Sequence, residues 1–268
     1  MSFPFFHPYR LYVQPLLLGC FLVLGSLAFV GCNSSSPSEK ETTESPPKSE
    51  TATSPPSAAV QEVSFKTSDG WTIIGDLYSP TKKSVGAVIL LHQRNGSAKD
   101  WKSLCTALQE AGITALAIDQ RGAGRSTQGP GPTGDDAPWP TSEDTTAAIA
   151  SLKTTRPIGL AGASYGANNA LIYAAAHSNK IKGVALFSPG ANYNGLDALA
   201  PAQSYKGSLT IYHDKSDSIA GDGPEKINTS TVSTDHALHL SDGSKHGTDL
   251  LTTEVIQDAV QYFQRILK

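Results

Sequence analysis

Apolar residues recur along the chain after residue 60 in two spacings, which alternate from one segment to the next. Gly86–His92 is a continuous apolar run, as expected of a strand that is buried on both faces. Ala98–Ala111 instead carries Trp101, Leu104 and Leu108 at helical spacing. The same criteria predict strands at Val63–Phe65, Trp71–Tyr78, Ile113–Ile118, Ile158–Ala161, Ile181–Phe187, Leu209–His213 and Ala237–Leu240, and helices at Ser142–Lys153, Tyr165–His177 and Leu250–Leu267. Strands that alternate with helices indicate the α/β class, with a mostly parallel central sheet and helices on both faces.

The N-terminal segment is an apolar region of another kind. Residues 11–30 contain no charged residue and follow Arg10, which is typical of an export signal. The segment ends in Phe29-Val30-Gly31-Cys32, which resembles the processing site of bacterial lipoproteins, where the cysteine receives the lipid. Leu17-Leu18-Gly19-Cys20 fits the same pattern, but cleavage there would leave a second apolar stretch on the mature protein. We therefore expect lipidation at Cys32.

An uncleaved transmembrane anchor is the alternative interpretation of this segment, because about 20 apolar residues suffice to span a bilayer. Both interpretations predict an extracytoplasmic protein that is held at a membrane.

Residues 33–60 have a different composition again. Ser, Thr and Pro occupy 17 of the 28 positions, and there is no aromatic residue. Such a segment cannot bury enough apolar surface to offset the entropy of ordering it, so we expect a disordered tether. The sequence thus predicts a signal and lipoprotein segment at 1–32, a tether at 33–60 and a single folded domain at 61–268.

Composition excludes several classes of partner. The formal net charge is −3 at pH 7, which is too small to indicate binding to nucleic acid. With Cys105 as the one cysteine of the expected domain, no disulfide framework is possible there. No His-x-x-x-His pair indicates a metal site, and Gly122-Ala-Gly124 lacks the third glycine of a dinucleotide loop, at Thr127. We expect no metal and no cofactor.

The candidate chemistry begins at Gly162-Ala-Ser-Tyr-Gly166. Ser164 stands between an expected buried strand and an expected helix, and ligands of parallel sheets bind at the carboxyl ends of the strands. Glycines on both sides of the serine let strand and helix approach closely around a sharp turn. This context favours Ser164 as a nucleophile over a structural glycine pair around an idle serine.

A serine hydroxyl needs a base. The expected domain offers His92, His177, His213, His236, His239 and His246. His246 lies in a turn-rich loop after the last expected strand, from which an imidazole can reach over the carboxyl edge of the sheet. His236 and His239 flank that strand and suit solvent or packing, while His177 ends a helix and suits its dipole. We therefore expect His246 to be the base.

The third member of a triad orients the imidazole and should leave a strand end between Ser164 and His246. Asp217 follows the strand Leu209–His213 and is our choice. Asp214 in the same loop is the near alternative, and Asp197 is a weaker one. The chain order Ser, Asp, His differs from that of the trypsin-like and subtilisin-like proteases.

With these residues in place, the domain resembles the α/β-hydrolases over nearly all of residues 61–268. It is similar to the small members with little or no lid that are related to dienelactone hydrolase and simple carboxylesterases. Two further stretches carry the resemblance: Leu91-His-Gln-Arg-Asn-Gly96 matches the His-Gly-x loop, and Asp119-Gln-Arg-Gly-Ala-Gly-Arg-Ser126 matches the Asp-x-Arg-Gly-x-Gly-x-Ser turn.

The resemblance implies an α/β-hydrolase fold without a large cap domain, Ser164 as nucleophile, Asp217 as acid and His246 as base. It implies an oxyanion hole made by the backbone N–H groups of Tyr165 and Arg94. The chain departs from the family twice. Gln93 stands where the family usually has glycine, and true dienelactone hydrolases carry cysteine at the position of Ser164.

The sequence therefore predicts an extracytoplasmic serine hydrolase that cleaves short-chain carboxylic esters, with a small-molecule ester as substrate and a membrane as partner through Cys32. A peptidase or amidase of the same fold is the alternative within enzymes. The alternative from another class is an inactive surface lipoprotein that binds a ligand in the former cleft.

Overall fold

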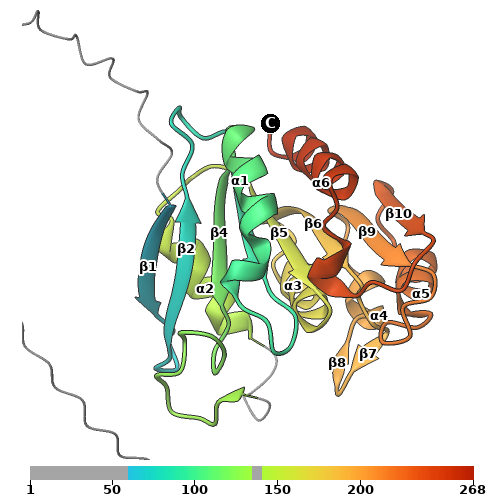
Figure 1. The fold of residues 1–268 in the computed structure, drawn as a ribbon, viewed down its shortest axis with the longest axis horizontal. Helices are drawn as coiled ribbons and strands as arrows, with labels where there is room; N and C mark the ends of the chain where they lie inside the picture. Colours follow the sequence, from blue (N-terminus) through green and yellow to red (C-terminus); the bar gives the residue numbers. More distant parts are fainter. Residues whose placement is uncertain (1–59, 135–140) are drawn as a thin grey trace, which may run out of the picture. The chain divides into compact units, whose positions relative to one another are not determined.

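A mixed sheet of eight strands organises the computed structural model, which describes residues 60–134 and 141–268 (Figure 1). The strands are β1 (Val60–Lys66), β2 (Thr72–Tyr78), β3 (Ala87–Leu91), β4 (Thr114–Asp119), β5 (Ile158–Ala163), β6 (Ile181–Phe187), β9 (Ser208–Asp214) and β10 (His236–Ser241). Their order is β1-β2-β4-β3-β5-β6-β9-β10. The pairs β1–β2 and β2–β4 are antiparallel, and every other pair in the sheet is parallel. The predicted mostly parallel sheet is thus confirmed.

Two helical layers enclose the sheet. The α-helices are α1 (Lys102–Glu110), α2 (Ser142–Ser151), α3 (Tyr165–Ala176), α4 (Leu199–Ala202), α5 (Gly223–Ser230) and α6 (Thr253–Ile266), and the 3₁₀ turns are η1 (Ala98–Trp101) and η3 (Gly247–Leu250). Helices α1 and α6 pack together against one face, and α2 and α3 pack against the other (Figure 1). Successive residues of a strand point to opposite faces. Accordingly Val88 and Leu90 face α1 and α6, while Ile89 and Leu91 face α2 and α3, all without exposure to solvent.

Some elements differ from those that the sequence predicts. Strand β1 begins at Val60, one residue before the expected domain boundary, because Val60 pairs with Tyr78 of β2. The expected final helix, Leu250–Leu267, begins later: Leu250 is the last residue of η3, and α6 begins only after Thr252, whose side chain accepts a hydrogen bond from the N–H of Val255 at 3.4 Å.

The connection between β6 and β9 contains an unexpected hairpin of β7 (Asn192–Tyr193) and β8 (Leu196–Asp197), which lies against α3. It is followed by α4. Helix α5 was also not expected from the sequence, although Pro224 in its first turn is a recognised start signal. In the described part of the chain, none of these connections forms a large cap over the sheet, as expected.

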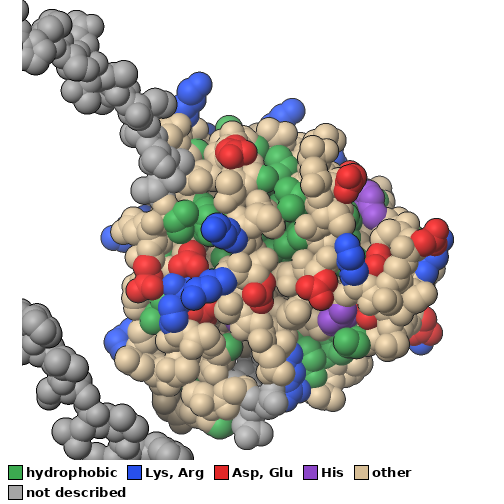
Figure 2. All heavy atoms as spheres, viewed as in Figure 1, with side chains coloured by type: hydrophobic (Ala, Val, Ile, Leu, Met, Phe, Trp, Pro, Cys, Tyr) green, Lys and Arg blue, Asp and Glu red, His purple; other side chains and the backbone are tan. Residues whose placement is uncertain are grey.

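Charged side chains of both signs are interspersed over the face shown in Figure 2, in keeping with the small net charge. Among residues 60–134 and 141–268, no helix has the length and apolar character needed to cross a membrane, and no group of three or more side chains is arranged to hold a metal ion. The expected signal segment, Cys32 and nearly all of the expected tether lie outside the described residues.

Candidate active site

Ser164 occupies the turn between β5 and α3 in a strained backbone conformation. Its φ is 51° and its ψ is −117°, values that non-glycine residues rarely adopt. The turn is held because the Ser164 N–H donates to the carbonyl of Phe187 at 2.8 Å. Such a residue costs about 1–3 kcal/mol and persists only where its surroundings hold it, which is typical of functional sites.

The two glycines of the motif are required by close contacts. A Cβ on Gly162 would lie 2.2 Å from the carbonyl oxygen of Gly166, and a Cβ on Gly166 would lie 2.1 Å from the carbonyl oxygen of Leu91. Both distances are far below van der Waals contact. Helix α3 can therefore start directly over the end of β3, and this arrangement presents Ser164 at the carboxyl edge of the sheet.

The structure brings two of the predicted residues, Asp217 and His246, into direct contact. His246 lies between β10 and η3, and its Nδ1 is 2.8 Å from Oδ2 of Asp217. An ionised carboxylate only accepts hydrogen bonds, so Nδ1 carries the proton of the neutral imidazole, and Nε2 has a lone pair that can accept a proton. This is the tautomer that a general base needs.

Asp217 is buried, with 2 % of its surface exposed. Its Oδ1 accepts the N–H groups of Ile219 at 3.0 Å and Ala220 at 3.2 Å. Burial by itself raises the pKa of Asp217, but the hydrogen bonds from His246, Ser188 and the Ala220 N–H outweigh it, so the pKa is lowered overall. The carboxylate is therefore ionised at neutral pH and can stabilise a protonated His246.

The two alternative aspartates have other partners. Asp214 accepts hydrogen bonds from the hydroxyl of Ser241 and from the Lys245 N–H at 2.8 Å, so it fixes the turn that precedes His246. Asp197 accepts the N–H of Leu199 at 2.9 Å, close to the start of α4. Both roles are those of loop-capping carboxylates.

His92 is buried beneath the site. The Gln120 N–H donates to its Nε2 at 3.0 Å, so the ring proton resides on Nδ1, which donates to the Gln93 carbonyl at 2.6 Å. Burial lowers the pKa of His92, and the ring stays neutral. His92 thus connects the end of β3 to Gln120, the residue that follows β4, through hydrogen bonds of its ring.

The other histidines lie in different surroundings. His177 stacks on Tyr173 at 4.1 Å and His239 stacks on Tyr212 at 4.8 Å, measured between ring centroids. His213 is buried, with its Nε2 3.8 Å from Oε1 of Glu225. His236 Nδ1 lies 2.7 Å from the carbonyl of Ser233.

The candidate oxyanion donors lie on two segments that contact each other through the Arg94 and Tyr165 side chains. Tyr165 begins α3, where the helix dipole favours negative charge. Arg94 follows β3, and its guanidinium donates to the Tyr165 hydroxyl at 3.2 Å. The turn after β4 supports this region, because the Asp119 carboxylate accepts the Ala98 N–H and the Arg125 Nε, each at 2.6 Å.

Two residues near the site were not predicted from the sequence. Ser188 follows β6 with a φ of 50°, and its Oγ accepts the Gly247 N–H at 3.0 Å. The Tyr193 ring stacks on that of Tyr165 at 5.1 Å, and its hydroxyl donates to the Ser188 carbonyl at 3.1 Å. Burial raises the pKa of Tyr193, so it stays neutral. The position of Ser188 directly after a buried strand was the available signal, because carboxyl ends of parallel strands share one edge.

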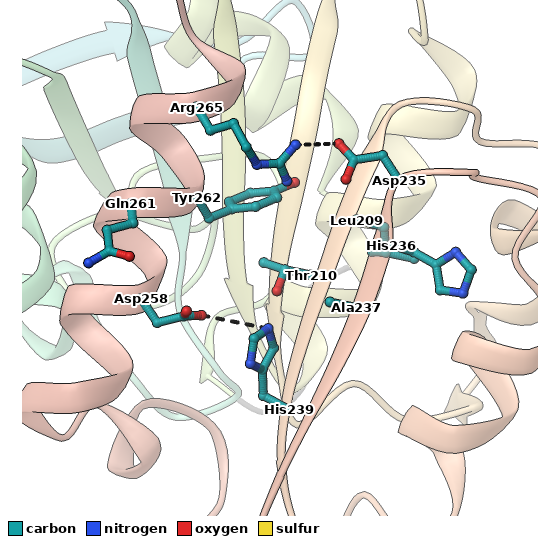
Figure 3. Close-up of a pocket in the computed structure, with 10 residues that line it drawn as sticks. All are labelled: Leu209, Thr210, Asp235, His236, Ala237, His239, Asp258, Gln261, Tyr262 and Arg265. Atoms are coloured by element: carbon teal, nitrogen blue, oxygen red, sulfur yellow. Dashed lines mark hydrogen bonds and ion pairs between the residues drawn. The ribbon is translucent and has the colours of Figure 1, made fainter.

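Two cavities differ in their relation to this site. One of about 430 Å³ adjoins the Arg94 loop and is lined by polar residues and small ones, among them His92, Arg94, Arg121 and Thr127, whereas Ser164 and His246 are not part of its lining. The other, of about 290 Å³, lies between α6 and the first residues of β9 and β10 (Figure 3). In this second cavity, Arg265 Nη1 and Asp235 Oδ2 form an ion pair at 2.7 Å. The second cavity is at the amino ends of the strands, away from Ser164, and does not belong to the candidate active site.

Comparisons with known proteins agree with this architecture. Similar solved structures include an esterase from Pyrococcus furiosus, with 18% identity, 79% of this chain and 92% of that chain covered, and a TM-score of 0.67. A thermostable carboxyl esterase from Bacillus coagulans has 16% identity, coverage of 78% and 99%, and a TM-score of 0.63. Est1E from Butyrivibrio proteoclasticus, solved with ferulic acid, has 16% identity, coverage of 76% and 98%, and a TM-score of 0.62. At these identities the likeness shows the fold alone.

No curated protein matches the chain in sequence. A family model described as the alpha/beta hydrolase fold matches residues 86–237, from the residue before β3 to the start of β10. This match spans more than half of the chain, and the protein therefore belongs to the α/β hydrolase fold family.

Proposed function

We propose that the protein is a serine hydrolase that cleaves carboxylic esters with Ser164, His246 and Asp217. The observation that carries this proposal is the 2.8 Å contact between His246 Nδ1 and Asp217 Oδ2, at the same sheet edge as the strained Ser164 turn. Two of the similar structures reported above are named as esterases. They support the class of reaction, not a particular substrate.

The proposed reaction has two halves, acylation of Ser164 and hydrolysis of the acyl-enzyme, and His246 takes up and returns one proton in each. The Ser164 oxygen attacks the acyl carbonyl while His246 Nε2 takes the hydroxyl proton, and Asp217 stabilises the imidazolium that forms. The N–H groups of Tyr165 and Arg94 bind the oxyanion. His246 then protonates the leaving alkoxide, and water repeats the cycle on the acyl-enzyme to release the acid.

Two rival functions make different predictions. An amidase or peptidase would use the same groups on an amide, so it would also react with a fluorophosphonate, but it would hydrolyse matched amides at a substantial rate, whereas an esterase would hydrolyse the esters alone. A binding protein without activity would not be labelled. Fluorophosphonate labelling followed by matched ester and amide assays therefore tests the proposal, and a wild-type protein that resists labelling would contradict it.

The proposed substrate is a small ester with a short acyl chain. The cavity beside the Arg94 loop has no large apolar side chain among its described lining residues. The loop that contains Thr127 and Gln128 lies beside this cavity. It is held in place because the Thr72 N–H donates to the Gln128 carbonyl at 2.8 Å. Gly129 packs so closely on Trp71 that a Cβ would lie 2.1 Å from the indole. A serine at position 164 disfavours a true dienelactone hydrolase, whose nucleophile is cysteine.

A series of 4-nitrophenyl esters from acetate to palmitate measures this preference. We expect kcat/KM to stop rising at about butyrate and activity to be low at about ten carbons and beyond, without activation at an oil–water interface. Each buried methylene contributes about 0.8 kcal/mol, so an apolar acyl tunnel would raise kcat/KM roughly fourfold per methylene. A continuing rise toward the long chains would therefore contradict the proposed preference for short acyl chains.

The proposed location is outside the cytoplasm, with a lipid on Cys32. Support comes from Phe29-Val30-Gly31-Cys32 and from the polar segment that follows it. Cys32→Ser should abolish incorporation of a labelled fatty acid in a bacterial host that processes lipoproteins, whereas Cys20→Ser serves as the matched control and should keep it. Undiminished labelling of the Cys32 variant would refute this site, and absence of label from the wild type would favour an uncleaved anchor.

A further inference from the structure

Gln93 is the residue at which this chain departs from the usual glycine of the family loop. It follows β3 and directly precedes Arg94. Its backbone carbonyl accepts two hydrogen bonds, from His92 Nδ1 at 2.6 Å and from the Gly96 N–H at 3.0 Å. The main chain at Gln93 is thus fixed by its neighbours, and the direction of its side chain is set.

The side chain of Gln93 reaches to the loop that carries His246. Its Oε1 accepts the backbone N–H of Thr248 at 2.9 Å and the Thr248 hydroxyl at 3.3 Å. Thr248 is only two residues after His246, although it lies 155 residues from Gln93 in sequence. The amide oxygen of Gln93 therefore links the loop that carries His246 to the loop after β3.

Gly247, the residue between His246 and Thr248, has no side chain that would block this contact. Its φ is +59°, and a Cβ there would lie 1.9 Å from Gln93 Oε1 and 3.6 Å from the Cβ of Ala163. Its N–H donates to Ser188 Oγ at 3.0 Å. The chain after His246 is thus held from two sides, by Gln93 and by Ser188, next to the turn that presents the nucleophile.

We propose that Gln93 is a positioning residue, which holds the His246 loop against the Arg94 loop so that the base and one oxyanion donor keep a constant separation. The proposal rests on the function proposed above for His246 and Arg94. The amide oxygen of Gln93 is occupied by Thr248, so we assign Gln93 to holding the loop and not to the substrate. A displacement of about 1 Å in a catalytic group can cost about 10²-fold in rate.

The test compares Gln93→Met, which keeps the length of the side chain but has no amide oxygen, with Gln93→Glu, which keeps an acceptor. We expect Gln93→Met to lower kcat by about 10- to 100-fold with little change in KM. Its Thr248 amide should also exchange hydrogen faster. Gln93→Glu should retain slow exchange at Thr248. Thr248→Ala removes only the longer hydroxyl contact and should cost less kcat than Gln93→Met.

A double-mutant cycle with Gly247 provides a second measurement. Gly247→Ala should harm kcat in the wild type for two reasons, the collision of the new methyl with Gln93 Oε1 and the strain of alanine at a φ of +59°. A Gln93→Gly background should relieve the collision and leave the strain, so the loss of kcat should be smaller there. Additive effects on kcat would contradict the contact, because residues that do not interact give additive changes.

Three further outcomes overturn the proposal. The first is an unchanged Thr248 exchange rate in Gln93→Met, and the second is an accelerated exchange with unchanged kcat. A loss of activity that only follows the fraction of folded protein would also refute positioning. Failure of the wild type on all esters and on the fluorophosphonate would refute the proposed function instead. The exchange measurement does not require activity, and it still decides whether Gln93 holds the loop.

Discussion

Replacing Ser164 with alanine is expected to lower kcat/KM for 4-nitrophenyl acetate by about 10⁴- to 10⁶-fold and to abolish fluorophosphonate labelling. Alanine keeps the Cβ and therefore the strain at a φ of 51°, so only the nucleophilic oxygen is lost. The melting temperature should change little. A variant that retained several per cent of wild-type activity would show that Ser164 is not the nucleophile.

The companion variant Ser164→Gly separates strain from chemistry. Glycine adopts a positive φ without the steric cost of a Cβ, which is about 1–3 kcal/mol here, but it loses about 0.5–1 kcal/mol more entropy on folding. Ser164→Gly should therefore be as inactive as Ser164→Ala and more stable by about 1 kcal/mol. Denaturant unfolding of the two variants measures this difference, and equal stabilities would refute the argument that the turn stores strain.

Asp217→Asn should lower kcat by about 10⁴-fold with the fold intact. Asparagine can present its amide N–H₂ to His246 Nδ1, and that contact stabilises the tautomer whose Nε2 already carries a proton. Asp214→Asn and Asp197→Asn are the matched controls, because their carboxylates contact Lys245, Ser241 and Leu199 instead of His246. Steady-state kinetics on all three variants tests the assignment, and an inactive Asp214 or Asp197 variant with a normal fold would transfer the acid role to that residue.

Asp217→Asn is also expected to change how the stability of the fold depends on pH under acidic conditions. The pKa of Asp217 is lowered in the folded protein, from an ordinary value of about 3.9. Its carboxylate therefore stabilises the fold fully above about pH 4, and this contribution disappears as the pH falls through the lower folded pKa. Asp217→Asn should lack this part of the pH dependence. Unfolding curves of the two proteins between pH 2 and 6 should converge toward the acid end, and a constant difference would contradict the linkage.

Local patterns were sufficient to predict most of the fold. The strands that the sequence predicts at Gly86–His92 and Ile181–Phe187 form as β3 and β6, because a largely apolar run is stable where both faces of a strand are covered. Lys182, the one charged residue of these two runs, is exposed near the start of β6. The helix after Ser164 was equally predictable, since glycine turn and apolar run adjoin in sequence. The β7–β8 hairpin and α5 were not predicted. They are short, and their stability comes from packing against α3, β9 and β10 instead of from a repeating apolar pattern.

The candidate site, like the fold, was predictable from the sequence only in part. The sequence by itself determined the order of the elements, the turn at Ser164 and the set of loops that could supply a base and an acid, because these features depend on neighbouring residues. Only the tertiary structure decided that His246 meets Asp217 and not Asp214, three residues earlier, whose carboxylate is occupied by Ser241 and Lys245. Only the structure showed that the Gln93 amide oxygen reaches Thr248 across 155 residues. Such contacts join side chains whose separation is set by how whole layers pack, and no local spacing of residues encodes that distance.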